Sequence, residues 1–305
     1  MPNFNLKLYN FEKEGKGVEV DEKKPLGVFQ VFILYFRYFW KMTLYNVIQF
    51  VNLLPIVSVM VAMAVIMMGS EAINELIAQD RFQTFNQSYP WVMICINVYY
   101  FFSENAFIQA IGMILFVAAV LCVGPLSAGF FYAARNTTRE EHVFTSDIFS
   151  QAWENRKQAI LVGLLDVAAS FAVLIYFTTD FSYLNYGYGQ VMGFLKYFAL
   201  LIYVFYLVIR VYVYTIMVTF DMPLKEIFKA AILLTYSHLP RSLVIWFTMA
   251  AVVLANLYLP LPSLLLVPLL DLSLVNFISG FMVYKPIDKY MIQPALKEQN
   301  QTGEE

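Results

Sequence analysis

Apolar and polar residues alternate along this chain in long blocks. Each apolar block is close to the roughly 20 residues that a helix needs to cross a bilayer. Polar segments rich in charged or turn-forming residues separate the blocks. The pattern predicts an all-α fold, a polytopic membrane bundle of six transmembrane helices, with spans at about 44–68, 106–134, 159–179, 191–220, 242–259 and 261–284.

Aromatic or amphipathic segments precede the first, third and fifth predicted spans. They cover residues 26–41, 147–156 and 221–239. Apolar residues at helical spacing suit helices that lie at the headgroup level, and Asp221 is expected to cap the last of them. We therefore predict a threefold quasi-repeat of an interfacial helix followed by a membrane hairpin. Two alternatives stay open: any hairpin protein needs interfacial linkers, and residues 26–41 fit equally well as an extension of the first span.

The longest connection, residues 69–105, has a polar part and a short apolar part. The polar residues 69–82 are expected to be partly helical. The apolar residues 89–102 number only fourteen, fewer than a span needs. We therefore predict an interfacial or re-entrant segment here rather than a seventh crossing.

Basic residues gather in alternate connections. Seventeen of the 20 Lys and Arg residues lie in the N-terminal segment through Lys41, in residues 135–158, in residues 221–241, or from Lys285 onward. Cytoplasmic loops carry such an excess, so we place these segments and both termini in the cytoplasm. The chain then divides into a cytoplasmic tail at 1–25, a membrane domain at 26–290 and a second cytoplasmic tail at 291–305.

Composition agrees with a membrane protein and excludes several functions. Hydrophobic residues make up 60% of the chain and charged residues only 14%, against about 25% charged in soluble domains. The lipid bilayer is therefore the first expected partner. Basic residues are too scattered for nucleic-acid binding. The nucleophile-elbow, zinc-protease, P-loop and dinucleotide motifs are absent from the sequence, so we expect neither an enzyme nor a cofactor.

Ionisable residues inside the predicted spans are the first candidates for a functional site. Asp166 lies in the third span, Arg210 in the fourth and Asp271 in the sixth. Ionisable groups at membrane depth are costly and often functional. We expect Arg210 to pair with Asp166, and the two carboxylates to lie at a similar depth. The alternative is a structural role, either as an ion pair or as a protonated Asp bonded to a backbone carbonyl.

Uncharged residues in the first two spans predict helix contacts. Asn46, Gln49 and Asn52 form a polar stripe at three-residue spacing. Unpaired amides in hydrocarbon cost about 2–7 kcal/mol each, so this stripe should face other helices. The small residues Gly124 and Gly129 in the second span are expected to permit close helix packing rather than to line a pore.

The stretch GPLSAGFFYAARNTTREEHVFTSDIFSQAWENRKQ carries a family resemblance. It contains a G-P-x-x-A-G-x-x-Y-x-x-R run followed by R-E-E-H-x-F, and LPIVS lies upstream in the first span. An FD pair and H-L-P-R follow downstream. With these blocks the chain resembles the YesL family, bacterial integral membrane proteins of unassigned biochemical function. The matching residues are Leu54, Pro55, Gly124, Pro125, Gly129, Tyr132, Arg135, Glu140, Glu141, His142, Asp147, Asn155, Asp221, His238, Pro240 and Arg241.

The resemblance implies a multi-pass protein of the bacterial plasma membrane, encoded with genes for carbohydrate uptake. We therefore predict a non-enzymatic accessory or scaffold protein that works beside a carbohydrate ABC importer or its sensor. The alternative is a small-solute transporter with a midplane site at Asp166, Arg210 and Asp271. No metal is expected, because the two His residues lack ligand spacing. The predicted cytoplasmic docking face comprises Arg135, Arg139, Glu140, Glu141, His142, Asp147, Asn155, Asp221, His238 and Arg241.

Overall fold

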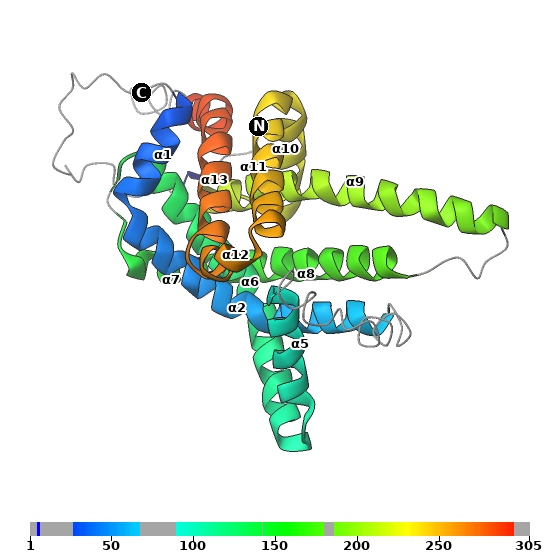
Figure 1. Ribbon diagram of the computed structural model, residues 1–305. Helices are drawn as coiled ribbons and strands as arrows, with labels where there is room; N and C mark the ends of the chain where they lie inside the picture. The colour runs from blue at the N-terminus through cyan, green and yellow to red at the C-terminus, as the bar shows by residue number, and fades with distance from the viewer. Residues whose placement is uncertain (1–4, 7–26, 68–89, 142, 180–185, 296–305) are drawn as a thin grey trace, which may run out of the picture.

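The computed structural model describes residues 5–6, 27–67, 90–141, 143–179 and 186–295, which are almost entirely helical (Figure 1). The predicted helical segment at 69–82 and the candidate His142 lie outside these residues. The helices are α1 (Gly27–Arg37), α2 (Phe39–Met67), α5 (Pro90–Ser103), α6 (Ala106–Thr138), α7 (Thr145–Glu154), α8 (Arg156–Thr178), α9 (Tyr186–Met217), α10 (Leu224–Ser237), α11 (Leu239–Tyr258), α12 (Pro260–Leu266) and α13 (Leu272–Ile287), with π-helical segments η1 (Val267–Asp271) and η2 (Asp288–Ile292).

Six helical stretches are long and apolar enough to cross a membrane, which confirms the predicted fold class. Five of them are α2, α6, α8, α9 and α11, and the sixth runs through α12, η1, α13 and η2. Most of these helices begin a few residues before the predicted apolar blocks, because backbone hydrogen bonding does not stop where hydropathy falls. The corner at Pro260 ends α11 and begins α12, since proline cannot continue the preceding helix.

The three linker segments each contain a helix, as the quasi-repeat predicts. These helices are α1, α7 and α10, which come before α2, α8 and α11. The chain leaves regular helix at Tyr38, so α1 is a separate helix rather than an extension of α2. Asp221 does not cap α10: that helix begins at Leu224, after Pro223, whose extended backbone forms the N-terminal boundary.

The two ends of the helical domain lie together. The start of α1 and the end of α13 are at the same end of the molecule, beside α10 (Figure 1). A short antiparallel pairing joins β1 (Asn5–Leu6) to β2 (Phe220–Asp221), directly after α9. This arrangement agrees with an even number of crossings.

The bundle is packed in one half and open in the other. We call the first the packed half: residues 119–138 of α6, 156–166 of α8, 208–217 of α9, and α13, together with α1, α7 and α10. Its core includes large buried side chains such as Phe131, Tyr212 and Phe277. We call residues 106–118, 167–178, 188–207 and 246–258 the splayed half: in Figure 1 the start of α6 points away from α8 and α9, while α8 and α9 extend side by side beyond the core and contact each other through Ser170 and Tyr203. None of their side chains is buried, so their apolar surfaces are available to lipid.

The closest helix contact lies between α6 and α8 in the packed half. A methyl group added at Gly124 would overlap the backbone of Ala159, and one added at Gly163 would overlap the backbone of Gly124. A methyl group at Gly129 would likewise overlap the backbone of Ile148 in α7. Glycine is therefore needed at these positions for close packing, which is the role predicted for Gly124 and Gly129.

The short apolar segment forms α5, a helix of 14 residues. It packs against α2 and the beginning of α6, and the indole of Trp91 donates a hydrogen bond of 3.0 Å to the carbonyl of Ser263 in α12. The side chain of Cys95, also in α5, is buried. The helix is shorter than the six spanning stretches, as expected of a segment that does not cross on its own.

Candidate functional site

Asp166 and Arg210 meet in the packed half, where α8 lies against α9. Arg210 Nε is 2.8 Å from Asp166 Oδ2. The hydroxyl of Tyr214 donates to the same oxygen at 2.7 Å, and the hydroxyl of Tyr206 donates to Oδ1. Arg210 Nη2 also reaches Ser127 Oγ on α6 at 3.4 Å. The predicted pair is therefore formed, within a network that joins three helices.

The two tyrosines were not predicted, although the sequence contains a signal for them. Tyr203, Tyr206, Arg210 and Tyr214 recur every three or four residues, which places them on one face of α9. Tyr203 extends the network through a 2.8 Å hydrogen bond with Ser170. The carboxylate thus has one cationic and two neutral donors, an arrangement that stabilises an ionised Asp inside the membrane.

Asp271 has a different environment. It ends η1, where its side chain is 8% exposed, and its Oδ2 accepts a 2.6 Å hydrogen bond from Asn256 Nδ2 on α11. Among the described residues, Asp166 and Asp271 share no hydrogen-bond or ion-pair partner. Their direct contacts are therefore separate, and the prediction of one midplane site stays a prediction.

The polar stripe on α2 faces other helices, as predicted. Asn46 donates to the carbonyl of Val267 at 2.8 Å and accepts from the backbone amide of Ser273 at 2.7 Å. Gln49 accepts from Asn276 at 3.0 Å, and Asn52 donates to the carbonyl of Ala119 at 3.2 Å. A π-helical turn leaves backbone groups without regular partners, and Asn46 supplies partners on both sides of η1.

Arg135 is half-buried at the end of α6, where it bonds within the packed half. Its Nη1 donates to the carbonyl of Val218 at 2.8 Å and to Thr219 Oγ1 at 3.1 Å, and its Nε donates to Asn136 at 2.9 Å. The guanidinium therefore joins the end of α6 to the end of α9, where helix carbonyls lack partners of their own. These bonds give Arg135 a structural role, and its assignment to the docking face stays a prediction.

The acidic and basic residues after α6 mostly bond within the chain. Arg139 pairs with Glu141 at 2.9 Å, and Glu140 lies 3.7 Å from Arg37 of α1. Lys41 donates to the carbonyl of Val143 at 3.0 Å. These contacts fix the loop between α6 and α7 against the α1–α2 corner.

The remaining docking-face candidates differ in exposure. Asp147 accepts from the backbone amide of Phe144 at 2.9 Å and stabilises the start of α7. His238 ends α10, with its ring 5.1 Å from that of Tyr290. Arg241 is half-buried at the start of α11. Asp221 is exposed, and its backbone pairs with Asn5.

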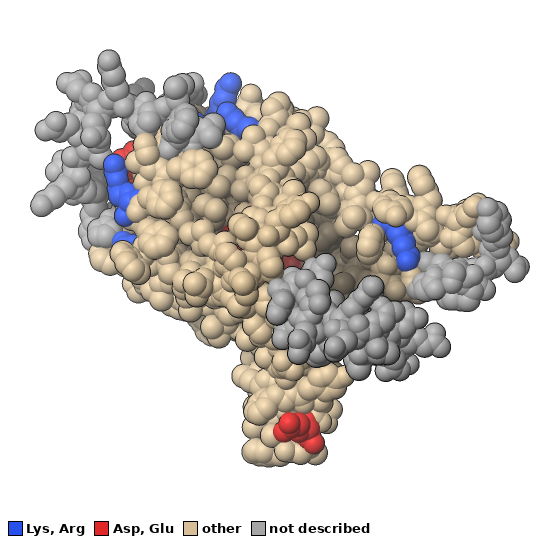
Figure 2. Space-filling model, in the orientation of Figure 1, with Lys and Arg blue, Asp and Glu red and all other residues tan. Residues whose placement is uncertain are grey.

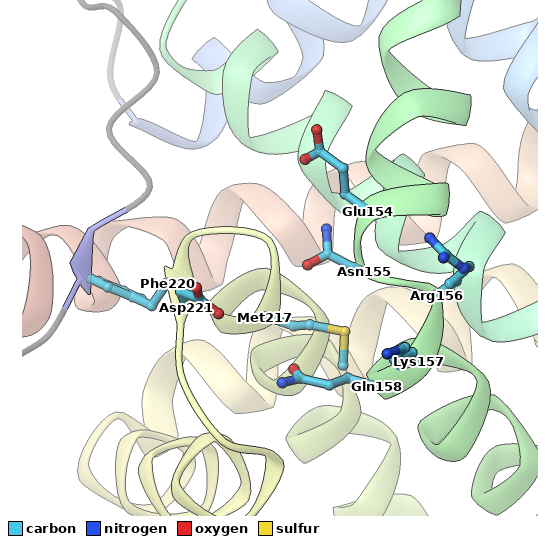
Figure 3. Close-up of a pocket in the computed structure, with 8 residues that line it drawn as sticks. All are labelled: Glu154, Asn155, Arg156, Lys157, Gln158, Met217, Phe220 and Asp221. Carbon is cyan, nitrogen blue, oxygen red and sulfur yellow. The ribbon is translucent and has the colours of Figure 1, made fainter.

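A pocket of about 360 Å³ lies where α7 meets α8, beside the end of α9 (Figure 3). Both signs of charge line it, and two of the lining residues, Asn155 and Asp221, belong to the predicted docking face. Asn155 donates to the carbonyl of Gln151 at 3.0 Å, and Gln158 donates to the carbonyl of Met222 at 3.0 Å. The lining residues are Glu154, Asn155, Arg156, Lys157, Gln158, Met217, Phe220 and Asp221.

Charged side chains are few on the visible face of the molecule and lie mostly toward its edges (Figure 2). Within the described residues, no group of three His, Cys, Asp or Glu side chains is placed to hold a metal ion. Comparison with known proteins adds no assignment: no family model, curated protein or solved structure matches this chain.

Proposed function

We propose that this protein is a membrane-embedded accessory or scaffold protein that docks a partner protein at the pocket between α7–α8 and the end of α9. The observation that carries the proposal is the pocket itself, which opens on the packed half and combines acidic and basic side chains. Glu154, Lys157 and Asp221 are exposed there. A surface with both signs of charge favours a partner segment of complementary charge pattern.

The walls of the pocket are held in place by the fold. Hydrogen bonds from Asn155 and Gln158 tie the α7–α8 corner to α7 and to the segment after α9. Arg135 joins the end of α9 to α6. A preorganised surface loses less conformational entropy when it binds, which supports a docking role.

The sequence supports two further parts of this proposal: the cytoplasmic position of the pocket and the class of partner protein. The excess of Lys and Arg beside the packed half supports a cytoplasmic position for the pocket and for both termini. The resemblance to the YesL family supports the bacterial plasma membrane and a carbohydrate ABC importer or its sensor as the partner.

Cross-linking in native membranes followed by affinity purification tests the proposal. We expect importer or sensor components to co-purify with the unmodified protein, and their yield to fall at least about tenfold in Asp221→Lys or Lys157→Glu, which corresponds to about 1.4 kcal/mol of binding free energy. Glu104→Lys, at the exposed turn between α5 and α6, is the matched control and should retain the partner. An unchanged yield in both pocket variants would contradict the docking role.

A second function, small-solute transport, is favoured by one observation. Asp271 is an intramembrane carboxylate whose hydrogen-bond partner, Asn256, is uncharged. Such residues mark substrate or ion pathways in many transporters. Solute uptake by the purified protein in liposomes, lost in Asp271→Asn, would support this function, and the absence of uptake across a panel of sugars and small ions would argue against it.

A further inference from the structure

Among the residues that the structure describes, Asp271 has an amide donor and no cationic partner. Asn256 Nδ2 donates to Asp271 Oδ2 at 2.6 Å and to the carbonyl of Val252 at 2.9 Å, so both amide hydrogens are used. Within the described part of the chain, no Lys, Arg or His nitrogen lies within 4.0 Å of the Asp271 carboxylate. An ionised carboxylate in this buried position would therefore lack a counter-ion among the described residues, which is costly in a low-dielectric interior.

Among the described residues, no charged side chain of the elements packed against η1 forms an ion pair with Asp271. The nearby polar groups on α2 are the amides Asn46 and Gln49, which bond to η1 and α13. The titratable group on this side is Tyr35 of α1, whose hydroxyl lies 2.8 Å from Ser273 Oγ. Burial raises the pKa of Tyr35, so its hydroxyl stays neutral at physiological pH.

The side-chain oxygen of Asn256, the amide partner, also lacks a hydrogen-bond donor among the described residues. Asn256 Oδ1 is buried and accepts no hydrogen bond from the described residues. A buried acceptor without a donor is unfavourable, and native structures rarely keep one. If Asp271 is protonated, its O–H group can donate to Asn256 Oδ1 while Asn256 Nδ2 donates back to the other carboxyl oxygen. This acid–amide pair contains two hydrogen bonds and no net charge.

We propose that Asp271 is a proton-binding site within the membrane, at which a neutral carboxylic acid and Asn256 form a doubly hydrogen-bonded pair between η1 and α11. Loss of the proton would leave a charge without a counter-ion and would return Asn256 Oδ1 to its unpaired state. Proton binding at this site therefore holds the fifth and sixth spans together. The inference does not rest on the docking proposal, which concerns the pocket beside α7 and α8.

The other intramembrane carboxylate provides the internal contrast. Asp166 has Arg210 and two tyrosine hydroxyls as donors, so its ionised form is the stabilised one. For Asp271 the neutral form is stabilised. The two aspartates therefore differ in their partners: one has a cationic donor and the other a neutral amide.

Infrared spectroscopy of the purified full-length protein in an ester-free detergent tests the proposal directly. A protonated carboxyl group has a C=O stretching band separate from the bands of ionised carboxylates. At neutral pH we expect a band equivalent to one carboxyl group per chain, absent in Asp271→Asn and retained in the control Asp221→Asn, which removes an exposed carboxylate. Asp271→Asn should fold, because an asparagine can form the same two hydrogen bonds with Asn256.

Asn256→Leu provides the second measurement. It removes the donor to the carboxyl oxygen, so the band should persist and shift to higher wavenumber as its C=O group loses a hydrogen bond. The proposal is overturned if the spectrum at neutral pH loses a carboxylate band rather than a carboxylic-acid band in Asp271→Asn. It is overturned equally if the acid band of the unmodified protein is unchanged by that substitution.

Discussion

In α6, residues from Ala119 to Thr137 pack against neighbouring helices, whereas residues 106–118 of the same helix have no buried side chain. Both segments are strongly apolar, so hydropathy alone does not separate them. The packed segment contains Gly124, Ala128 and Gly129, and the other presents large side chains such as Phe107. Within lipid, an apolar side chain gains little when it exchanges contact with lipid chains for contact with another helix. Helix association therefore depends on small residues and polar bonds.

The same contrast recurs in α8 and α9. In the packed half these helices share the Asp166–Arg210 network, and Gly163 of α8 meets Gly124 of α6. In the splayed half they present mainly large aliphatic and aromatic side chains. Exposed rings such as Phe194 and Tyr197 suit contact with lipid chains and their interface. We conclude that close fit at small residues, rather than hydrophobicity alone, sets where the spans of this protein pack most closely.

The largest expected effect comes from filling the α6–α8 contact. In Gly124→Ala the added methyl group would overlap the backbone of Ala159, and no side-chain rotation can relieve an overlap with backbone. We expect destabilisation by more than about 3 kcal/mol and a lower folded yield, measured by unfolding in increasing dodecyl sulfate. Gly193→Ala on α9 is the matched control, because nothing lies within 4 Å of its added methyl group. That control should be neutral or stabilising by up to about 1 kcal/mol.

The second-largest loss of stability is expected when the Asp166–Arg210 ion pair is broken. Asp166→Asn leaves the Arg210 guanidinium without its anionic partner and should cost about 3 kcal/mol of unfolding free energy. Arg210→Met should cost a similar amount, since it leaves the carboxylate with tyrosine donors only. The double variant should recover part of the loss, because neither charge remains. Strict additivity in this double-mutant cycle would show that the two side chains do not interact.

A smaller effect is expected where Arg135 joins α6 to α9. Arg135→Ala leaves the carbonyl of Val218 without its side-chain donor and should cost about 1–3 kcal/mol. Lys157→Ala, which removes an exposed cation near the same end of the bundle, should change stability by less than about 0.5 kcal/mol. Equal stabilities of the two variants would contradict the structural role of Arg135.

The sequence allowed much of this fold to be predicted, because bilayer thickness constrains span length. All six spans and the helices at 147–156 and 221–239 were predicted from apolar length and helical spacing, whereas the separation of α1 from the first span was left open. The Asp166–Arg210 pair was found because two opposite charges in adjacent spans have few other partners. The inward position of the Asn46 stripe followed from the cost of unpaired amides in lipid.

Other features depend on three-dimensional contacts that leave no local pattern. Arg135 follows an apolar run and precedes charged residues, so the sequence places it in a solvated loop; only the fold brings the carbonyl of Val218 beside it. Asn256 is a single amide in an apolar span, and its pairing with Asp271 depends on the turn at Pro260 and on η1. Periodicity identifies a helix face, but it does not identify the helix that packs against it.

The smallest change in stability is expected in the splayed half, where one pair of substitutions tests the difference between the two halves. Phe194 is 71% exposed on α9, so Phe194→Ala removes a ring that contacts few residues of the chain and should change the unfolding free energy by less than about 0.5 kcal/mol. Phe131→Ala on α6 is the matched substitution in the packed half, where the ring is 2% exposed and stacks on Tyr214 at 5.8 Å. It should destabilise the protein clearly, since it leaves a cavity. Equal losses from the two substitutions would mean that the splayed segments are held by contacts as close as those of the packed half, and the distinction between the halves would no longer stand.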